Sequence, residues 1–167
     1  MSPHAPMVVV VMGVAGSGKT TVGEQLAQQL SWEFRDADDF HPRENVAKMS
    51  AGIPLTDRDR APWLAAIRAY IDACLARGAS TVVTCSALKA SYRAVLLADS
   101  ARVRLVHLTG DFDLILERMN RRQGHFMKPE MLRSQFAALE PPDNALAFDI
   151  NRPPADIVAA IRRALAL

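Results

Sequence analysis

The sequence has little cysteine, little net charge and no long apolar run, and each shortage excludes a class of protein. The two cysteines, Cys74 and Cys85, form neither a C-x-x-C pair nor a spacing typical of a metal site. No run approaches the roughly 18 apolar residues that a membrane-spanning helix needs. The net charge of +2 is too small to indicate a nucleic-acid or membrane surface. Residues 1–6 lack the basic and apolar regions of a signal peptide, so we expect a cytoplasmic protein that binds neither nucleic acid nor membrane.

The remaining composition is that of an ordinary globular protein. Hydrophobic residues make up 50% of the chain and charged residues 23%, which excludes a disordered chain. There is no internal repeat, linker or low-complexity stretch. A chain of 167 residues can bury a sizeable core, so we predict a single domain over residues 1–167.

One short stretch carries the clearest chemical signal. Residues 13–20 read G-V-A-G-S-G-K-T and fit the phosphate-loop pattern G-x-x-x-x-G-K-[ST]. The valine run of residues 8–11 precedes the loop, and a helix-forming segment, residues 21–30, follows it. This strand, loop and helix order favours nucleotide binding over a glycine-rich turn with a chance lysine.

The residue types of this loop suit a nucleotide. Glycines let the loop curl so that its N–H groups point at a phosphate, and the following helix adds its free N–H groups and dipole. Lys19 supplies a mobile charge for the β- and γ-phosphates, and the Thr20 hydroxyl can ligate the Mg²⁺ of the nucleotide. The predicted nucleotide contacts are Gly13, Val14, Ala15, Gly16, Ser17, Gly18, Lys19, Thr20 and Thr21.

Two carboxylates follow the next predicted strand. Asp36 and Asp38 are two residues apart, so on an extended chain they face one way at the carboxyl end of the strand, where α/β sheets bind ligands. Such a pair can hold Mg²⁺, directly or through water, and can accept the proton of an attacking hydroxyl. A capped turn is the alternative. The strand predicted at residues 80–85 ends in Cys85 and not in aspartate, so we assign the magnesium-side carboxylate to Asp36.

Residues 41–78 read as a helical region inserted between the second and third strands. A region in this place can hold an acceptor substrate, and its basic residues Lys48, Arg58 and Arg60 are candidate contacts for an anion or a polyol. For any one of them alone, an exposed basic side chain is the simpler interpretation.

A second pair of basic residues indicates a lid at residues 118–130. Arg118 and Arg122 are four residues apart, so they share a helix face, and Gly124 follows as a hinge. A lid of this kind closes arginines over transferring phosphates and excludes water. A solvated basic helix end is the alternative.

The order of apolar runs predicts the fold class. Strands expected at residues 7–12, 32–36, 80–85, 103–108 and 148–150 alternate with helical segments. This alternation predicts an α/β P-loop fold with a five-stranded, doubly wound parallel sheet and helices on both faces.

Several blocks together resemble the gluconate kinases (gluconokinases) of the small P-loop kinase group, which is related to the shikimate and nucleoside monophosphate kinases. Beyond the phosphate loop, the resemblance rests on Asp36-Ala37-Asp38 with His41-Pro42, Lys48-Met49 with Gly52-Ile53-Pro54-Leu55, Asp57-Arg58-Asp59-Arg60 with Pro62-Trp63-Leu64, Cys85-Ser86-Ala87-Leu88-Lys89 with Tyr92-Arg93, His125-Phe126, and Gln135-Phe136 with Leu139-Glu140-Pro141. These blocks span nearly the whole chain and are far more specific than the loop.

The resemblance implies ATP- and Mg²⁺-dependent phosphorylation of the 6-hydroxyl of D-gluconate, giving 6-phosphogluconate. It implies that Asp38 acts as base or orienter of that hydroxyl and that Asp36 helps to hold Mg²⁺ through water. Acceptor contacts would come from His41, Lys48, Arg60 and Arg93, and Arg118 and Arg122 would clamp phosphates. Members of the family are often homodimers. The short stretch at residues 141–145 departs from the family pattern, and residues 151–154 are expected to border adenine.

Other functions remain open at this point. A kinase for another small acceptor, such as shikimate or a nucleotide, shares the donor half of the site. A regulatory GTP-binding switch is disfavoured because the sequence has no N-K-x-D and no D-x-x-G segment. A nucleic-acid binder is disfavoured by the weak excess of positive charge.

Overall fold

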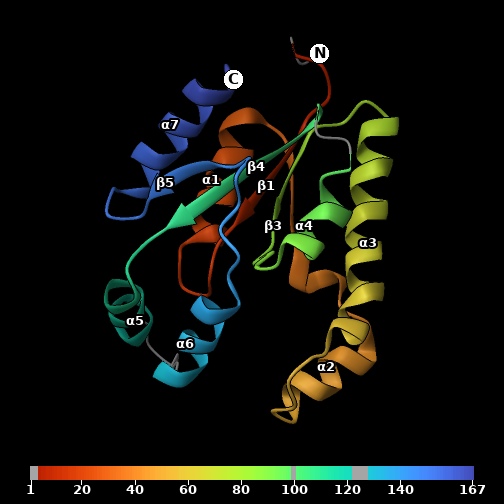
Figure 1. Ribbon diagram of the computed structural model, residues 1–167. Helices are drawn as coiled ribbons and strands as arrows, with labels where there is room; N and C mark the ends of the chain where they lie inside the picture. Colours follow the sequence, from red (N-terminus) through yellow and green to blue (C-terminus); the bar gives the residue numbers. More distant parts are fainter. Residues whose placement is uncertain (1–3, 99–100, 122–127) are drawn as a thin grey trace.

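A parallel sheet forms the centre of the computed structural model, which describes residues 4–98, 101–121 and 128–167 (Figure 1). Its strands are β1 (Val8–Met12), β2 (Glu33–Asp36), β3 (Thr81–Thr84), β4 (Val103–Thr109) and β5 (Leu146–Asp149). Their order is β2-β3-β1-β4-β5, and every neighbouring pair is parallel. The predicted five-stranded parallel sheet is therefore confirmed.

Helices connect the strands and cover both faces of the sheet. They are α1 (Lys19–Leu30), α2 (Arg43–Ser50), α3 (Asp57–Ala76), α4 (Ala90–Leu96), α5 (Phe112–Arg121), α6 (Pro129–Ala138) and α7 (Pro154–Leu165), with a short 3₁₀ helix, η1 (Ala37–Phe40). The sequence did not predict η1 or α4, because four and seven residues are too few for a helical period to stand out. No described helix has both the length and the apolar character that crossing a bilayer requires.

The core explains why the central strand is a run of valines. All five residues of β1 are buried, and its side chains alternate between the two faces. On one face, Val10 joins a cluster with Ile67 and Ile71 of α3. On the other, Val11 joins a cluster that includes buried residues of α1 and α7, among them Leu26. A strand covered on both faces has no polar face, which is why the sequence reads as continuous apolar residues.

The carboxyl ends of the strands point toward α2, α5 and α6. Figure 1 shows these helices gathered at one end of the sheet, with the segment that leads into β1 and the end of α7 at the other. In parallel α/β sheets the carboxyl end is the ligand-binding end. The arrangement therefore brings the phosphate loop, which follows β1, to the same end as the segments that follow β2 and β3.

Helix α1 lies very close to the sheet at Gly23. A Cβ at this position would lie 2.7 Å from Thr84 Cγ2 and 3.0 Å from Phe34 Cε2. Alanine is the better helix former by about 1 kcal/mol, but overpacking a tight contact costs about 1–3 kcal/mol. We expect Gly23→Ala to lower the free energy of unfolding by about 1 kcal/mol, measured by urea denaturation. An increase in that free energy would show that α1 can shift to relieve the contact.

Candidate active site

The phosphate loop, residues 13–20, joins β1 directly to α1. Gly16 and Gly18 have φ angles of 78° and 91°, a left-handed conformation that glycine adopts without strain. At Gly16 space is limiting as well, because a Cβ there would collide with the Met119 side chain of α5. The loop glycines therefore serve both the curled backbone and the close packing of α5 against the loop.

The Lys19 side chain is folded onto its own loop. Its Nζ donates to the carbonyl oxygens of Gly13, at 3.0 Å, and Val14, at 3.1 Å. Burial lowers the pKa of Lys19, while the nearby Asp38 and Asp36 act in the opposite direction. The lysine is thus held inside the loop, next to the carboxylates that the sequence singled out.

Asp36 and Asp38 line one cavity with Lys19 and Thr20. The geometry differs from the predicted extended pair, because the 3₁₀ helix η1 begins at Ala37. Asp36 caps this helix, since its Oδ1 accepts a hydrogen bond of 2.9 Å from the Asp38 N–H. The two carboxylates are brought together by this capped turn and not by the alternation of a strand.

The Asp38 carboxyl has an altered affinity for protons because of its surroundings. Partial desolvation in the cavity and the neighbouring Asp36 carboxylate raise the pKa of Asp38, against the effects of His41 and Lys19. Its side chain is 85% exposed, so solvent screens these charges and limits the rise. Asp38 therefore remains reachable by a substrate hydroxyl at the open side of the cavity.

The oxygen atoms around Thr20 fit the hydration shell of a magnesium ion. Thr20, Asp36 and Thr84 line the same cavity, and the buried Thr84 Oγ1 has no hydrogen-bond partner among the described residues. An orphan hydroxyl beside a carboxylate suits a metal-bound water, because Mg²⁺ usually keeps several waters. The described part of the chain holds no group of three His, Cys, Asp or Glu residues that could hold a metal ion by itself. These oxygen atoms are too few to hold a metal ion by themselves, and they suit an ion that a nucleotide brings with it.

Cys85 also lines this cavity but is not equipped for nucleophilic chemistry. Its side chain is buried, and burial raises the pKa of the thiol to about 12. The thiol is therefore protonated near neutral pH, and the thiolate is the nucleophilic form of cysteine.

His41 is fixed beside Asp38 by aromatic packing. Its ring stacks on Trp63, with centroids 4.4 Å apart, and Trp63 Nε1 donates to the Ala37 carbonyl oxygen at 2.7 Å. The His41 Nε2 lies 4.0 Å from the Asp38 Oδ1. Burial lowers the pKa of His41, although Asp38 opposes this. A neutral imidazole can offer either a donor or an acceptor to a polyol.

Lys48 and Arg60 were both predicted to contact the acceptor, but the structure gives them different surroundings. Lys48 Nζ lies 2.9 Å from both carboxylate oxygens of Asp59, whose pKa is lowered to about 2 by hydrogen bonds from Thr56 and Lys48. Arg60 donates to the Tyr92 hydroxyl at 3.2 Å and lines a small cavity with Trp63 and Ser86. Lys48 thus ties α2 to α3. Arg60 also donates to the Leu55 carbonyl oxygen at 2.9 Å, and the cavity that it lines shares Ser86 with the Asp38 cavity.

Arg93 is not brought to the Asp38 cavity. It is buried, and its guanidinium donates to the carbonyl oxygens of Ala87 at 2.8 Å, Leu88 at 3.0 Å and Glu140 at 2.6 Å. It lines a separate cavity with residues 141–144. In this structure Arg93 fastens the loop after β3 to the segment after α6.

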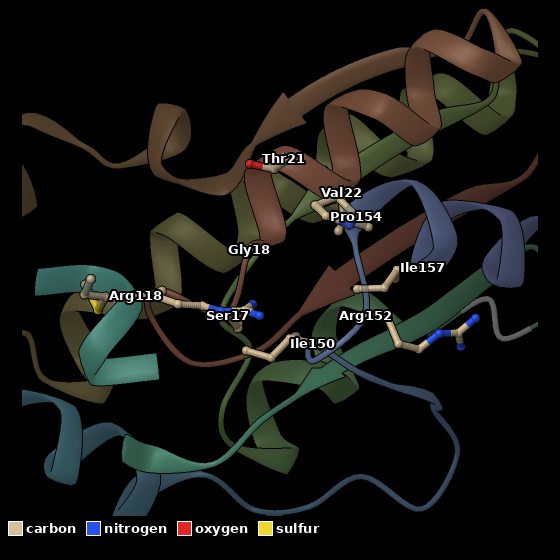
Figure 2. Close-up of a pocket in the computed structure, with 11 residues that line it drawn as sticks. Ser17, Gly18, Thr21, Val22, Arg118, Ile150, Arg152, Pro154 and Ile157 are labelled. Carbon is tan, nitrogen blue, oxygen red and sulfur yellow. The ribbon is translucent and has the colours of Figure 1, made fainter. Parts of the chain in front are cut away.

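A further pocket opens on the other side of the phosphate loop (Figure 2). It is lined by Gly16, Ser17, Gly18, Thr21, Val22, Arg118, Met119, Ile150, Arg152, Pro154 and Ile157. Figure 2 shows the Arg118 side chain extending toward Ser17, whereas Arg152 extends away from the loop. The predicted second arginine, Arg122, lies outside the described residues, as does much of the predicted lid.

Sequence reasoning missed several residues that line these two cavities. Thr84 and Gln135 line the Asp38 cavity, and Ile150 and Ile157 form an apolar wall of the pocket in Figure 2. For Ile150 a signal was available, because it ends the apolar run next to residues 151–154, which were expected to border adenine. Gln135 stands in one of the blocks that carry the family resemblance, but that block assigns it no role, and its place beside the phosphate loop emerged only from the fold.

Comparisons with known proteins find kinases among the relatives of this chain. A family model described as Shikimate kinase matches residues 15–140. The chain is 44% identical to a probable gluconokinase of Mus musculus, covering 97% of this chain and 99% of that protein. It is 48% identical to a gluconokinase of Gluconobacter oxydans, covering 82% and 77%. Among solved structures, a gluconokinase from Sinorhizobium meliloti has a TM-score of 0.87 at 44% identity, covering 98% and 93%.

Proposed function

The chain belongs to the gluconokinase family of P-loop kinases, and from this premise we propose that it transfers the γ-phosphoryl group of ATP to the 6-hydroxyl of D-gluconate. The product would be 6-phospho-D-gluconate. The observation that carries the proposal is the single cavity lined by Lys19, Thr20, Asp36 and Asp38. The proposal is supported because the residues of a phosphate loop and a candidate base line the same cavity, as transfer from donor to acceptor would require.

The donor half of the site is built on the phosphate loop, residues 13–21. The nucleotide phosphates would take Lys19 Nζ, which now contacts two loop carbonyls, and the loop N–H groups other than that of Ala15, which donates to Gln135. The adenine would lie along the apolar wall of Ile150 and Ile157. Arg118, which lines the pocket beside the phosphate loop, would contact phosphate oxygens, and Arg122 is proposed as its companion in a lid over residues 118–130.

Thr20 and Asp36 would hold Mg²⁺, with Thr84 accepting a hydrogen bond from one of its waters. When bound, the ion neutralises charge on the phosphate oxygens. The part of this chain in the reaction is to fix the phosphates with Lys19, to keep the acceptor hydroxyl beside Asp38, and to take up its proton on the Asp38 carboxylate.

The acceptor half is proposed for the helical region, residues 41–78. His41 and Arg60 would contact hydroxyl and carboxylate groups of gluconate. His41 lies beside Asp38, and the cavity that Arg60 lines shares Ser86 with the Asp38 cavity. Lys48 would contact the acceptor only by leaving Asp59. For Arg93 we propose an effect through the loop carbonyls that it holds, because its hydrogen bonds already join backbone segments.

Replacing Arg60 by alanine should raise the KM for gluconate by about tenfold, the order expected for one lost hydrogen bond to a charged group, and leave the KM for ATP unchanged. Steady-state kinetics with each substrate varied in turn measures both constants. The sequence also offered Arg58 as a candidate contact, but this arginine of the same helix is exposed and lines neither the Asp38 cavity nor the Arg60 cavity, so Arg58→Ala is the matched control. A raised KM for ATP with an unchanged KM for gluconate would place Arg60 on the nucleotide side.

The acceptor itself is tested by a coupled assay of ADP release. The wild-type protein is supplied with ATP and Mg²⁺, and with gluconate, shikimate, glucose or a nucleoside monophosphate in separate reactions. We expect turnover with gluconate to exceed that with each other acceptor. Faster turnover with shikimate would favour the alternative small-acceptor kinase, and nucleotide binding without any acceptor-dependent turnover would favour a regulatory switch.

Two further proposals rest on the family resemblance alone. We propose a cytoplasmic enzyme, because both substrates are small and highly polar, and a homodimer, because family members often form one. Light scattering after size-exclusion chromatography distinguishes the 18.3 kDa monomer from a dimer.

A further inference from the structure

We propose that Gln135 of α6 binds the transferred phosphoryl group directly. Its carboxamide oxygen holds the phosphate loop at Ala15, and its amide N–H₂ donates to an oxygen of the γ-phosphoryl group. The proposal rests on the proposed kinase activity and adds to it a residue that distinguishes ATP from ADP.

The contact that carries this inference joins residues far apart in the sequence. The backbone N–H of Ala15 donates to Gln135 Oε1 at 2.6 Å, across 120 positions of the chain. A backbone N–H can only donate, so the carboxamide atom that faces Ala15 is the oxygen. The N–H₂ group therefore lies on the other side of the carboxamide from Ala15, where its two hydrogens can be donated to another group.

The Gln135 carboxamide forms part of the wall of the Asp38 cavity. Gln135 lines the cavity together with Ala15, Lys19 and Asp38. For transfer to occur, the γ-phosphoryl group must lie between the phosphate loop and the acceptor hydroxyl at Asp38. A neutral N–H₂ donor at this place suits phosphoryl oxygens, whose negative charge it stabilises without repelling Lys19.

Helix α6 gives Gln135 a fixed position. On one side the buried Leu132 anchors the helix in the core, and Phe136 packs against Phe112 of α5, with ring centroids 5.7 Å apart. Beyond the helix, Glu140 accepts from the Ala90 N–H at 2.7 Å through its side chain. The helix is thus attached both to α5 and to the start of α4, so its glutamine is presented by a supported element.

Two substitutions separate the oxygen from the N–H₂ group. Gln135→Glu keeps an acceptor for Ala15 but replaces the donors by a negative charge, and Gln135→Met removes both functions at similar length. Calorimetric titration without any acceptor measures the Kd for ADP and for AMPPNP, an analogue that retains a γ-phosphoryl group. Gln28→Glu, at an exposed position of α1, is the control for the change in net charge.

We expect Gln135→Glu to weaken AMPPNP binding by about tenfold or more, and ADP binding by less than about threefold, because only AMPPNP reaches the lost donors. Gln135→Met should also weaken AMPPNP more than ADP, and Gln28→Glu should bind both as the wild type does. Equal losses for ADP and AMPPNP, or unchanged AMPPNP binding in Gln135→Glu, would overturn the proposal.

The titrations, together with the acceptor assay described above, distinguish a failure of this proposal from a failure of the proposed function. Wild-type protein that turns over a different acceptor would refute gluconate as substrate, yet the difference between AMPPNP and ADP would still support Gln135. Wild-type protein that binds neither nucleotide would refute both proposals.

Discussion

Replacing Asp38 by asparagine should lower kcat by about 10²-fold or more, with little change in the affinity for ATP. Asparagine has nearly the same shape but cannot accept the proton of the attacking hydroxyl. The residual activity would come from the phosphate loop and Lys19, which the substitution leaves in place. Steady-state kinetics with gluconate gives kcat, and nucleotide titration gives the affinity for ATP.

The pH dependence gives an independent check on Asp38. A base must be deprotonated to act, and desolvation together with Asp36 raises the pKa of Asp38. Activity should therefore fall, as the pH is lowered, at a higher pH than an ordinary aspartate would give, and this limb should be absent from Asp38→Asn. Asp39→Asn, at the exposed neighbouring position, should keep this limb and move it only slightly, because Asp39 has the smallest of the named effects on the pKa of Asp38. Wild-type turnover in Asp38→Asn would remove Asp38 from the mechanism.

Replacing Lys19 by methionine should lower kcat/KM for ATP by about 10³-fold, because the only loop side chain that carries a positive charge is lost from the phosphates. Methionine keeps the length and apolar stem of lysine. Lys19→Arg should rescue little of the activity, since the planar guanidinium is bulkier and cannot repeat the contacts of Nζ with Gly13 and Val14.

The stability of the Lys19 variants must be measured alongside their activity. The Lys19 Nζ holds two loop carbonyls, so its removal could also loosen the loop. Thermal unfolding without nucleotide reports this effect separately. A kcat/KM within about tenfold of wild type in a well-folded Lys19→Met would contradict the assigned role.

Much of the fold could be predicted because its signals are local. The valines of β1, followed by the loop glycines and Lys19, specify a strand and a turn through burial and backbone conformation. The same holds for α3, whose capping box at Thr56 and Asp59 marks its first turn. The order of strands in the sheet carries no such local signal and emerged only from the structure.

The site was less predictable because its side chains are assigned by tertiary contacts. Lys48 and Arg93 have the charge expected of anion contacts, yet their partners in the fold are Asp59 and backbone carbonyls. Gln135 is uncharged and belongs to a block to which the resemblance assigned no role, yet it reaches the phosphate loop from 120 positions away. Residue type alone could not separate these cases, because each depends on which elements lie side by side.

The internal bonding of the helical region between β2 and β3 bears on how such enzymes diverge. Lys48 and Asp59 pair within it, and the side chain of Asn45 donates to the Asp59 carbonyl oxygen at 2.9 Å. The phosphate loop and the pocket beside α7 are built from other parts of the chain. Under the proposed function, substitutions at the acceptor contacts of this region would change the choice of acceptor without altering the residues that line the nucleotide pocket.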